Sequence, residues 1–188
     1  TDFTIDGVDV YNATGYAHFA RGGVGQINAG NPDAARASGT YTDCNTFNSQ
    51  VHFEQMGCED ITLTNCTATD GDGDISTEAY FHPLVGSRDI TYIGCTAVGD
   101  GLLGFSLISL VQPLENIRIV DCYVEISRFR SGIGLASLGP LETVNLKIVD
   151  STFISRDYIG ISLAGVSGTA TGSTFRGGVI GFDIGSLR

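Results

Sequence analysis

Short apolar strands recur along the chain, and each ends at a small or thiol-bearing residue. Apolar and polar residues alternate within every unit, and successive terminal positions lie 22 to 36 residues apart. The terminal positions are Val8, Cys44, Cys66, Cys95, Cys122, Ser151 and, in the weakest unit, Ser173. Self-similarity of this kind predicts a β-solenoid in which each repeat is one coil stacked on the next.

A second strand with period-two alternation follows each terminal position. These strands cover 17–19, 51–53, 79–81, 105–107, 133–135, 161–163 and 182–184. We expect the flanking residues of each triplet to face the core and the middle residue to face outward. Coils one to three would then display polar and aromatic side chains, whereas coils four to seven would display small ones such as Gly104, Ser106 and Gly134.

The composition fits a single domain, 1–188, with enough apolar content for a core. Of its 188 residues 42% are hydrophobic and 16% are charged, and no apolar run approaches the ~20 residues that a membrane span needs. The stretch near 21–38 is too long for a turn and predicts an excursion loop. Because neither end offers a helix-like cap, we expect the domain to be part of a longer chain.

The net charge argues against two classes of partner, and the positions of the cysteines predict free thiols. A net charge of −11 argues against duplex nucleic acid or an anionic membrane as partner, since both attract basic surfaces. Four of the five cysteines occupy terminal positions, so they should stack inward as a ladder of free, buried thiols.

Polar residues of the first three coils are the candidates for chemistry. Neighbouring coils lie about 4.8 Å apart, which would put His18, His52 and Tyr80 in one row and Glu54 with His82 in the next. The candidate catalytic residues are His52, Glu54, Glu78 and His82, and the candidate substrate-binding residues are Tyr16, His18, Arg21, Asp74 and Tyr80. Such a set suits general acid–base chemistry or sugar binding, whereas the simpler alternative is a set of solvated side chains.

Metal ions and cofactors are not expected. Stacked parallel strands arrange ligands in ladders, whereas a metal site needs ligands that converge. Calcium at Asp70, Asp72 and Asp74 is conceivable, but the EF-hand pattern fails because Phe81 occupies its twelfth position. A solvated acidic turn is the favoured interpretation.

The small residues predicted on the outer face of coils four to seven suggest a partner. A smooth sheet allows another backbone to approach closely. We therefore expect this half to pack against a neighbouring subunit in a homotrimer of parallel solenoids, or against a later part of the same chain.

The repeated phrase also resembles that of a known superfamily. Asp60-Ile-Thr-Leu-Thr-Asn-Cys66 and its echo Asp89-Ile-Thr-Tyr-Ile-Gly-Cys95 are similar to repeats of the right-handed parallel β-helix, pectate-lyase-like proteins and of bacteriophage tailspikes. The resemblance covers essentially the whole chain and implies an all-β, right-handed parallel β-helix of about seven coils. Members include polysaccharide lyases, glycoside hydrolases, mannuronan epimerases and trimeric phage depolymerases, so the fold does not select a reaction.

Three functions remain open. The first is a tailspike or tail-fibre segment on the virion tail that binds, and in the catalytic case depolymerises, a bacterial surface polysaccharide; hydrolysis would use Glu54 with Glu78 or Asp74. The second is a secreted lyase or C5-epimerase for acidic polysaccharides, because Gly15-Tyr-Ala-His18 resembles the tyrosine and histidine of the epimerases, although their Asp-Pro-His phrase is absent. The third is a non-catalytic stalk or adhesin module. The sugar, the linkage and the host are not encoded in any motif.

Overall fold

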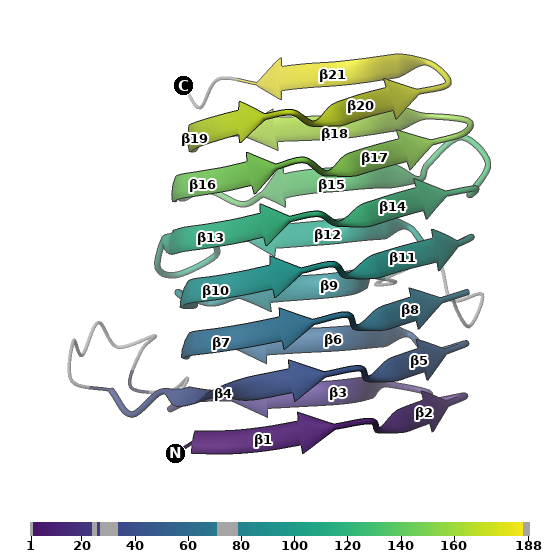
Figure 1. Ribbon diagram of the computed structural model, residues 1–188. Helices are drawn as coiled ribbons and strands as arrows, with labels where there is room; N and C mark the ends of the chain where they lie inside the picture. Colours follow the sequence, from purple (N-terminus) through teal and green to yellow (C-terminus); the bar gives the residue numbers. More distant parts are fainter. Residues whose placement is uncertain (1, 24–25, 27–33, 71–78, 186–188) are drawn as a thin grey trace.

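The chain folds into three parallel sheets that wind around a common core (Figure 1). The computed structural model describes residues 2–23, 26, 34–70 and 79–185, with the backbone alone for 180–185. Sheet A contains β1 (Asp2–Asp6), β4 (Ala37–Thr42), β7 (Cys58–Thr64), β10 (Arg88–Ile93), β13 (Leu114–Val120), β16 (Thr143–Val149) and β19 (Val166–Thr171). Sheet B contains β2 (Asp9–Tyr11), β5 (Asn45–Phe47), β8 (Thr67–Thr69), β11 (Thr96–Gly99), β14 (Tyr123–Ile126), β17 (Thr152–Ser155) and β20 (Thr174–Gly177).

Sheet C closes each coil and completes a right-handed parallel β-helix of seven coils. It contains β3 (Tyr16–Arg21), β6 (Val51–Met56), β9 (Ala79–Leu84), β12 (Leu103–Ile108), β15 (Ile133–Leu138), β18 (Ile159–Ala164) and β21 (Ile180–Gly185). The predicted fold class is confirmed, but each coil has three strands and not two. The strands of sheet B are only three or four residues long, so their alternation is too brief to stand out from the adjoining strand of sheet A.

One left-handed residue turns the chain from sheet A into sheet B in successive coils. Asp43, Asn65 and Asp121 have φ values of 51°, 52° and 51°, and Gly94 has 61°. Asparagine, aspartate and glycine are the residues that adopt this conformation most readily. The repeated phrase therefore ends in Asn, Asp or Gly followed by Cys because the turn comes immediately before the thiol.

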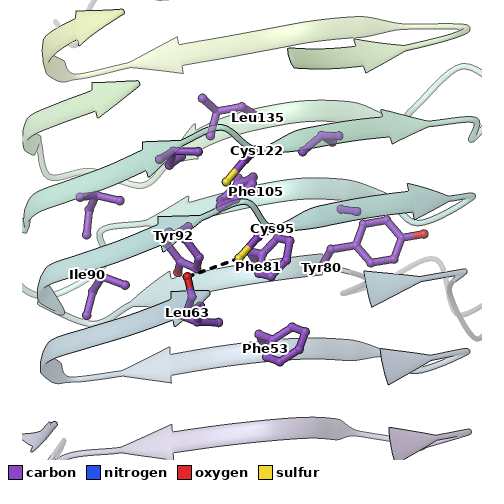
Figure 2. Packing of buried hydrophobic residues seen from close by; sticks show 14 of the residues in the cluster. Phe53, Leu63, Tyr80, Phe81, Ile90, Tyr92, Cys95, Phe105, Cys122 and Leu135 are labelled. Atoms are coloured by element: carbon purple, nitrogen blue, oxygen red, sulfur yellow. Dashed lines mark hydrogen bonds between the residues drawn. The ribbon is translucent and has the colours of Figure 1, made fainter. Parts of the chain in front are cut away.

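The thiols form the ladder that the sequence predicts. All five cysteines are free and buried, and the Sγ of Cys95 donates to the carbonyl oxygen of Leu63 at 3.5 Å (Figure 2). Hydrogen bonding to Cys122 and Cys66, together with burial, raises the pKa of the Cys95 thiol. Hydrogen bonding to Cys95 lowers the pKa values of the Cys66 and Cys122 thiols. Because all the thiols are buried, the ladder packs as part of the apolar core.

Aromatic rings from sheets A and C fill the middle of the solenoid. Phe53 stacks on Phe81 with ring centroids 5.4 Å apart, and Phe81 stacks on Phe105 at 4.8 Å (Figure 2). Tyr92 of sheet A meets Phe105 edge to face at 4.9 Å. Stacked coils place identical positions next to one another, so a repeated inward Phe becomes a continuous ring stack.

Sheet C bends so that two consecutive residues of a strand face the interior. A Cβ added at Gly104 would clash with Cγ1 of Val124, a buried core residue, and one added at Gly134 would lie 3.2 Å from Cβ of Phe153. The next residue in each strand, Phe105 or Leu135, is also in the core. The prediction that the second position faces outward is therefore wrong, and these glycines make room for sheet B instead of forming a smooth outer face.

The first coil is also offset by one residue from the predicted alignment. Tyr16 pairs with Val51 and His18 with Phe53, whereas the sequence pattern aligned His18 with His52. The imidazole of His18 stacks on Phe53 at 4.9 Å and is 5% exposed. A one-residue offset moves a side chain to the other face of a strand, which is why His18 lies inside.

Among the described residues, no helix is long and apolar enough to cross a membrane.

Candidate functional site

A seam runs along the outer face of sheet C between the first and fourth residues of its strands. Because the second and third residues face inward, the first and fourth are left outside and meet across the bend. Tyr16 and Phe19 stack at 4.8 Å, and Ala136 packs with Ala79 and Leu103 in a cluster separate from the main core. The outer pairs are Tyr16 with Phe19, Val51 with Glu54, Ala79 with His82, Leu103 with Ser106, Ile133 with Ala136, and Ile159 with Ser162. We call this surface the sheet C seam.

Glu54 and His82 form a buried pair in the seam. The two residues are register partners on β6 and β9, and Oε2 of Glu54 lies 3.3 Å from Nδ1 of His82. The Glu54 side chain is 2% exposed and that of His82 is 13% exposed. Oε1 of Glu54 and both ring nitrogens of His82 are buried and have no hydrogen-bond partner among the described residues. A buried carboxylate with an unpaired oxygen costs stability, which makes this pair a candidate for function.

Ser106 extends the polar row by one coil. Phe105 pairs with Phe81, which places Ser106 next to His82 on the outer face. Its Oγ is buried and has no hydrogen-bond partner in the part of the chain that the structure describes. Glu54, His82 and Ser106 therefore occupy one row on three successive coils.

An exposed aromatic pair lies at the N-terminal end of this row. Phe19 is the register partner of Glu54, and the nearly parallel rings of Tyr16 and Phe19 are 51% and 41% exposed as residues. Large aromatic side chains left in contact with water typically mark interaction sites, and a flat aromatic face suits the apolar face of a sugar ring.

The structure brings together only part of the predicted site. Glu54, His82 and Tyr16 lie in the seam, and Arg21 is exposed at the end of β3. Glu78 and Asp74, like Asp72, lie outside the described residues; Asp70, the first residue of that acidic turn, is exposed.

His52 and Tyr80 share a row, as predicted, but the row faces inward. Nδ1 of His52 is 2.6 Å from Oγ1 of Thr46, a buried residue of sheet B. The ring centroids of His52 and Tyr80 lie 4.7 Å apart. The Tyr80 hydroxyl accepts a hydrogen bond of 3.1 Å from the backbone N–H of Gly101. Each residue is 1% exposed, so together they fill the corner between sheets B and C.

Two residues of the seam were assigned to other places by the sequence pattern. Phe19 was expected in the core, and Ser106 on the smooth face of the fourth coil. The one-residue offset of β3 brings Phe19 outside, and the bend of sheet C brings Ser106 into line with His82. A period-two pattern predicts neither the offset of β3 nor the bend of sheet C.

The polar row of the seam holds a carboxylate, an imidazole and a hydroxyl, from Glu54, His82 and Ser106. Among the residues described, no group of three His, Cys, Asp or Glu side chains converges as a metal site would require. Oε2 of Glu54 lies within ion-pair distance of Nδ1 of His82, but Nδ1 makes no hydrogen bond among the described residues. The structure therefore shows a carboxylate beside an imidazole and leaves the tautomer of the ring unassigned.

No protein-family model, curated protein or solved structure matches this chain. The likeness to pectate-lyase-like proteins therefore rests on the repeated phrase and on the geometry of the coils. The seam has to be interpreted from its own chemistry.

Proposed function

We propose that the protein is a tailspike- or tail-fibre-like β-helix that binds a bacterial surface polysaccharide along the sheet C seam. The observation that carries the proposal is the exposed Tyr16–Phe19 stack lying beside the Glu54–His82 pair. The exposed aromatic pair would hold one sugar ring, next to the buried Glu54–His82 pair. A solenoid suits a linear polymer because both repeat at a fixed spacing.

His82 and Glu54 support a specific reaction on an acidic sugar. Nε2 of His82 would take the proton from C5 of a uronate, and the C4–O bond would break as a C4–C5 double bond forms. The leaving oxygen would then take a proton from the His82 imidazolium or from water. Glu54 would hold the imidazole in place and stabilise its charged form. The same step without bond cleavage is the start of C5 epimerisation, so the secreted lyase or epimerase is the second candidate.

Hydrolysis fits the described residues less well. It needs two carboxylates on either side of the glycosidic bond. Glu54 is the only carboxylate of the seam row whose side chain the structure describes: Asp183, in register with Ser162, is described by its backbone alone, and the predicted partners, Glu78 and Asp74, lie outside the described residues.

A homotrimer is part of the proposal. Leu110 and Val111, in the turn after β12, are 52% and 46% exposed, and Leu138 at the end of β15 is 43% exposed. Exposed apolar side chains on neighbouring coils suit a subunit contact. Sedimentation analysis of the wild type and of Leu110→Ser/Leu138→Ser would test it: a trimer that the double variant converts to a monomer supports the contact, and a monomeric wild type contradicts it.

The central test combines binding with turnover. A panel of bacterial and uronate polysaccharides would be assayed for binding and for the absorbance of unsaturated products. Tyr16→Ala and Phe19→Ala should weaken binding about tenfold each. Phe47→Ala is the matched control, because Phe47 is 40% exposed but belongs to sheet B. An equal loss in the Phe47 variant would remove the seam as the binding surface, and binding of no polysaccharide would favour the non-catalytic stalk.

A further inference from the structure

The outer face of sheet A carries a column of threonines that is interrupted by two cations. Register pairing places one residue of each coil in this column: Thr4, Thr40, Thr62, Thr91, Arg118, Lys147 and Thr169. Threonine is what the fold alone favours there, because β-branched residues suit an exposed parallel strand. Arg118 and Lys147 are direct register partners on β13 and β16.

Arg118 and Lys147 carry like charges at directly paired positions of the sheet. Like charges directly opposite one another on neighbouring strands destabilise a sheet. The chain contains 21 acidic residues, yet no described carboxylate forms an ion pair with Arg118 or Lys147. The stability of the sheet therefore does not explain why two cations occupy these positions, whereas ligand binding would.

A groove of 330 Å³ opens over the two cations. One wall is an amide ladder, in which Nδ2 of Asn145 donates to Oδ1 of Asn116 and Nδ2 of Asn116 donates to Oδ1 of Asp89, both at 2.8 Å. Thr62 and Thr91 continue the floor towards Asp60 and Asp89. The groove is thus positive at one end and acidic at the other, with hydroxyls and amides between.

We propose that Arg118 and Lys147 bind the carboxylate of an acidic polysaccharide. That the ligand is a polysaccharide rests on the proposed function, whereas the site itself is separate, since it lies on sheet A and the seam on sheet C. Neighbouring coils are about 4.8 Å apart, so a guanidinium and an ammonium can contact one carboxylate from two sides. A protein with a net charge of −11 repels anions, and a local pair of cations is what admits one.

The test is an NMR titration of the full chain with trigalacturonate and with its neutral methyl ester. The acid should shift the side-chain signals of Arg118 and Lys147, and the ester should not. Arg118→Thr and Lys147→Thr restore the threonine column. Each should lower the affinity for the acid about threefold, and the double variant should lower it about tenfold. Arg176→Thr is the control, because Arg176 is an exposed strand cation in sheet B.

A second readout needs no ligand. The double variant should unfold at a higher temperature than the wild type, because the like-charge pair is gone. Shifts confined to Tyr16, Phe19 and His82 would overturn the sheet A site and leave the seam standing. Shifts confined to Arg118 and Lys147 would support the sheet A site and overturn the seam as the binding surface. If Arg176→Thr lowers the affinity for the acid as much as Arg118→Thr does, the sheet A site is also overturned.

Discussion

The hydroxyl of Tyr92 donates a 2.6 Å hydrogen bond to Oε1 of Gln55 inside the solenoid. Tyr92 belongs to sheet A and Gln55 to sheet C, and both side chains are fully buried. The bond joins two sheets across the core. A polar pair in such surroundings stabilises the fold only while both partners are present.

Tyr92→Phe should therefore lower the free energy of unfolding by about 1–3 kcal/mol, because the amide oxygen of Gln55 is left buried and unpaired. Tyr92→Phe/Gln55→Met should cost less than the sum of the two single variants. Tyr123→Phe is the control, since its hydroxyl donates to Glu125 on the surface and should cost little. Urea unfolding measures all four, and strict additivity would contradict the coupling.

The inward bend of sheet C predicts a position-dependent cost for alanine at glycine. Gly104→Ala should destabilise the protein by about 3 kcal/mol, because its Cβ would collide with Val124 and with the carbonyl oxygen of Gly134. Gly15→Ala is the matched control, because no atom lies within 4 Å of the position of its added Cβ. Equal urea midpoints for the two variants would show that the second position of sheet C does not face the core.

Stability should fall at alkaline pH through buried groups such as Cys58. Burial raises the pKa of the Cys58 thiol from its ordinary value of 9.0 to about 12. Between these values the unfolded chain loses the proton first, so the stability present below pH 9 is lost as the pH rises towards 12. The full difference corresponds to about 4 kcal/mol.

Urea unfolding between pH 8 and pH 11 checks this effect, and Cys58→Ala should flatten the profile. Tyr41 and Tyr92, whose pKa values are also raised by burial, would retain a residual slope. Identical profiles for the wild type and Cys58→Ala would rule out a contribution from this thiol.

All five thiols should resist a thiol reagent in the native protein. Each cysteine is buried, and the thiolate, which is the reactive form, is disfavoured at Cys44, Cys58 and Cys95 by their raised pKa values. Hydrogen bonding to Cys95 lowers the pKa values of Cys66 and Cys122, so these two thiols are protected by burial alone. Titration with Ellman's reagent should detect none in the folded state and five in denaturant. Rapid reaction of one or more native thiols would show that the ladder is open to solvent.

Glu54→Gln should separate catalysis from folding. If the pair acts as a base, turnover of the polysaccharide found in the binding screen should fall about 10²- to 10⁴-fold, while the thermal midpoint stays close to that of the wild type. Glu59→Gln is the control, since Glu59 forms a surface ion pair with Arg88 and lies on sheet A. Unchanged turnover in Glu54→Gln would exclude the pair from the reaction.

The repeated phrase was sufficient to predict the solenoid, its number of coils and the ladder of free thiols. These features depend on what is the same in each coil, because stacking converts a sequence repeat into a column of like residues. Pairs such as Cys66 with Cys95 or Phe81 with Phe105 could be predicted because both members occur at equivalent points of clear strands.

The direction of side chains in sheet C was decided by the tertiary structure. A period-two pattern assumes a straight strand, whereas sheet C bends to close the coil and turns two consecutive residues inward. Tyr80 and Gly104 therefore became interior residues, and the offset of β3 sent His18 inward and Phe19 outward. The sequence by itself determined which residues stack; the closure of the coil, set by packing between sheets B and C, decided on which side of the strand each residue lies and so placed Glu54, His82 and Ser106 in one row.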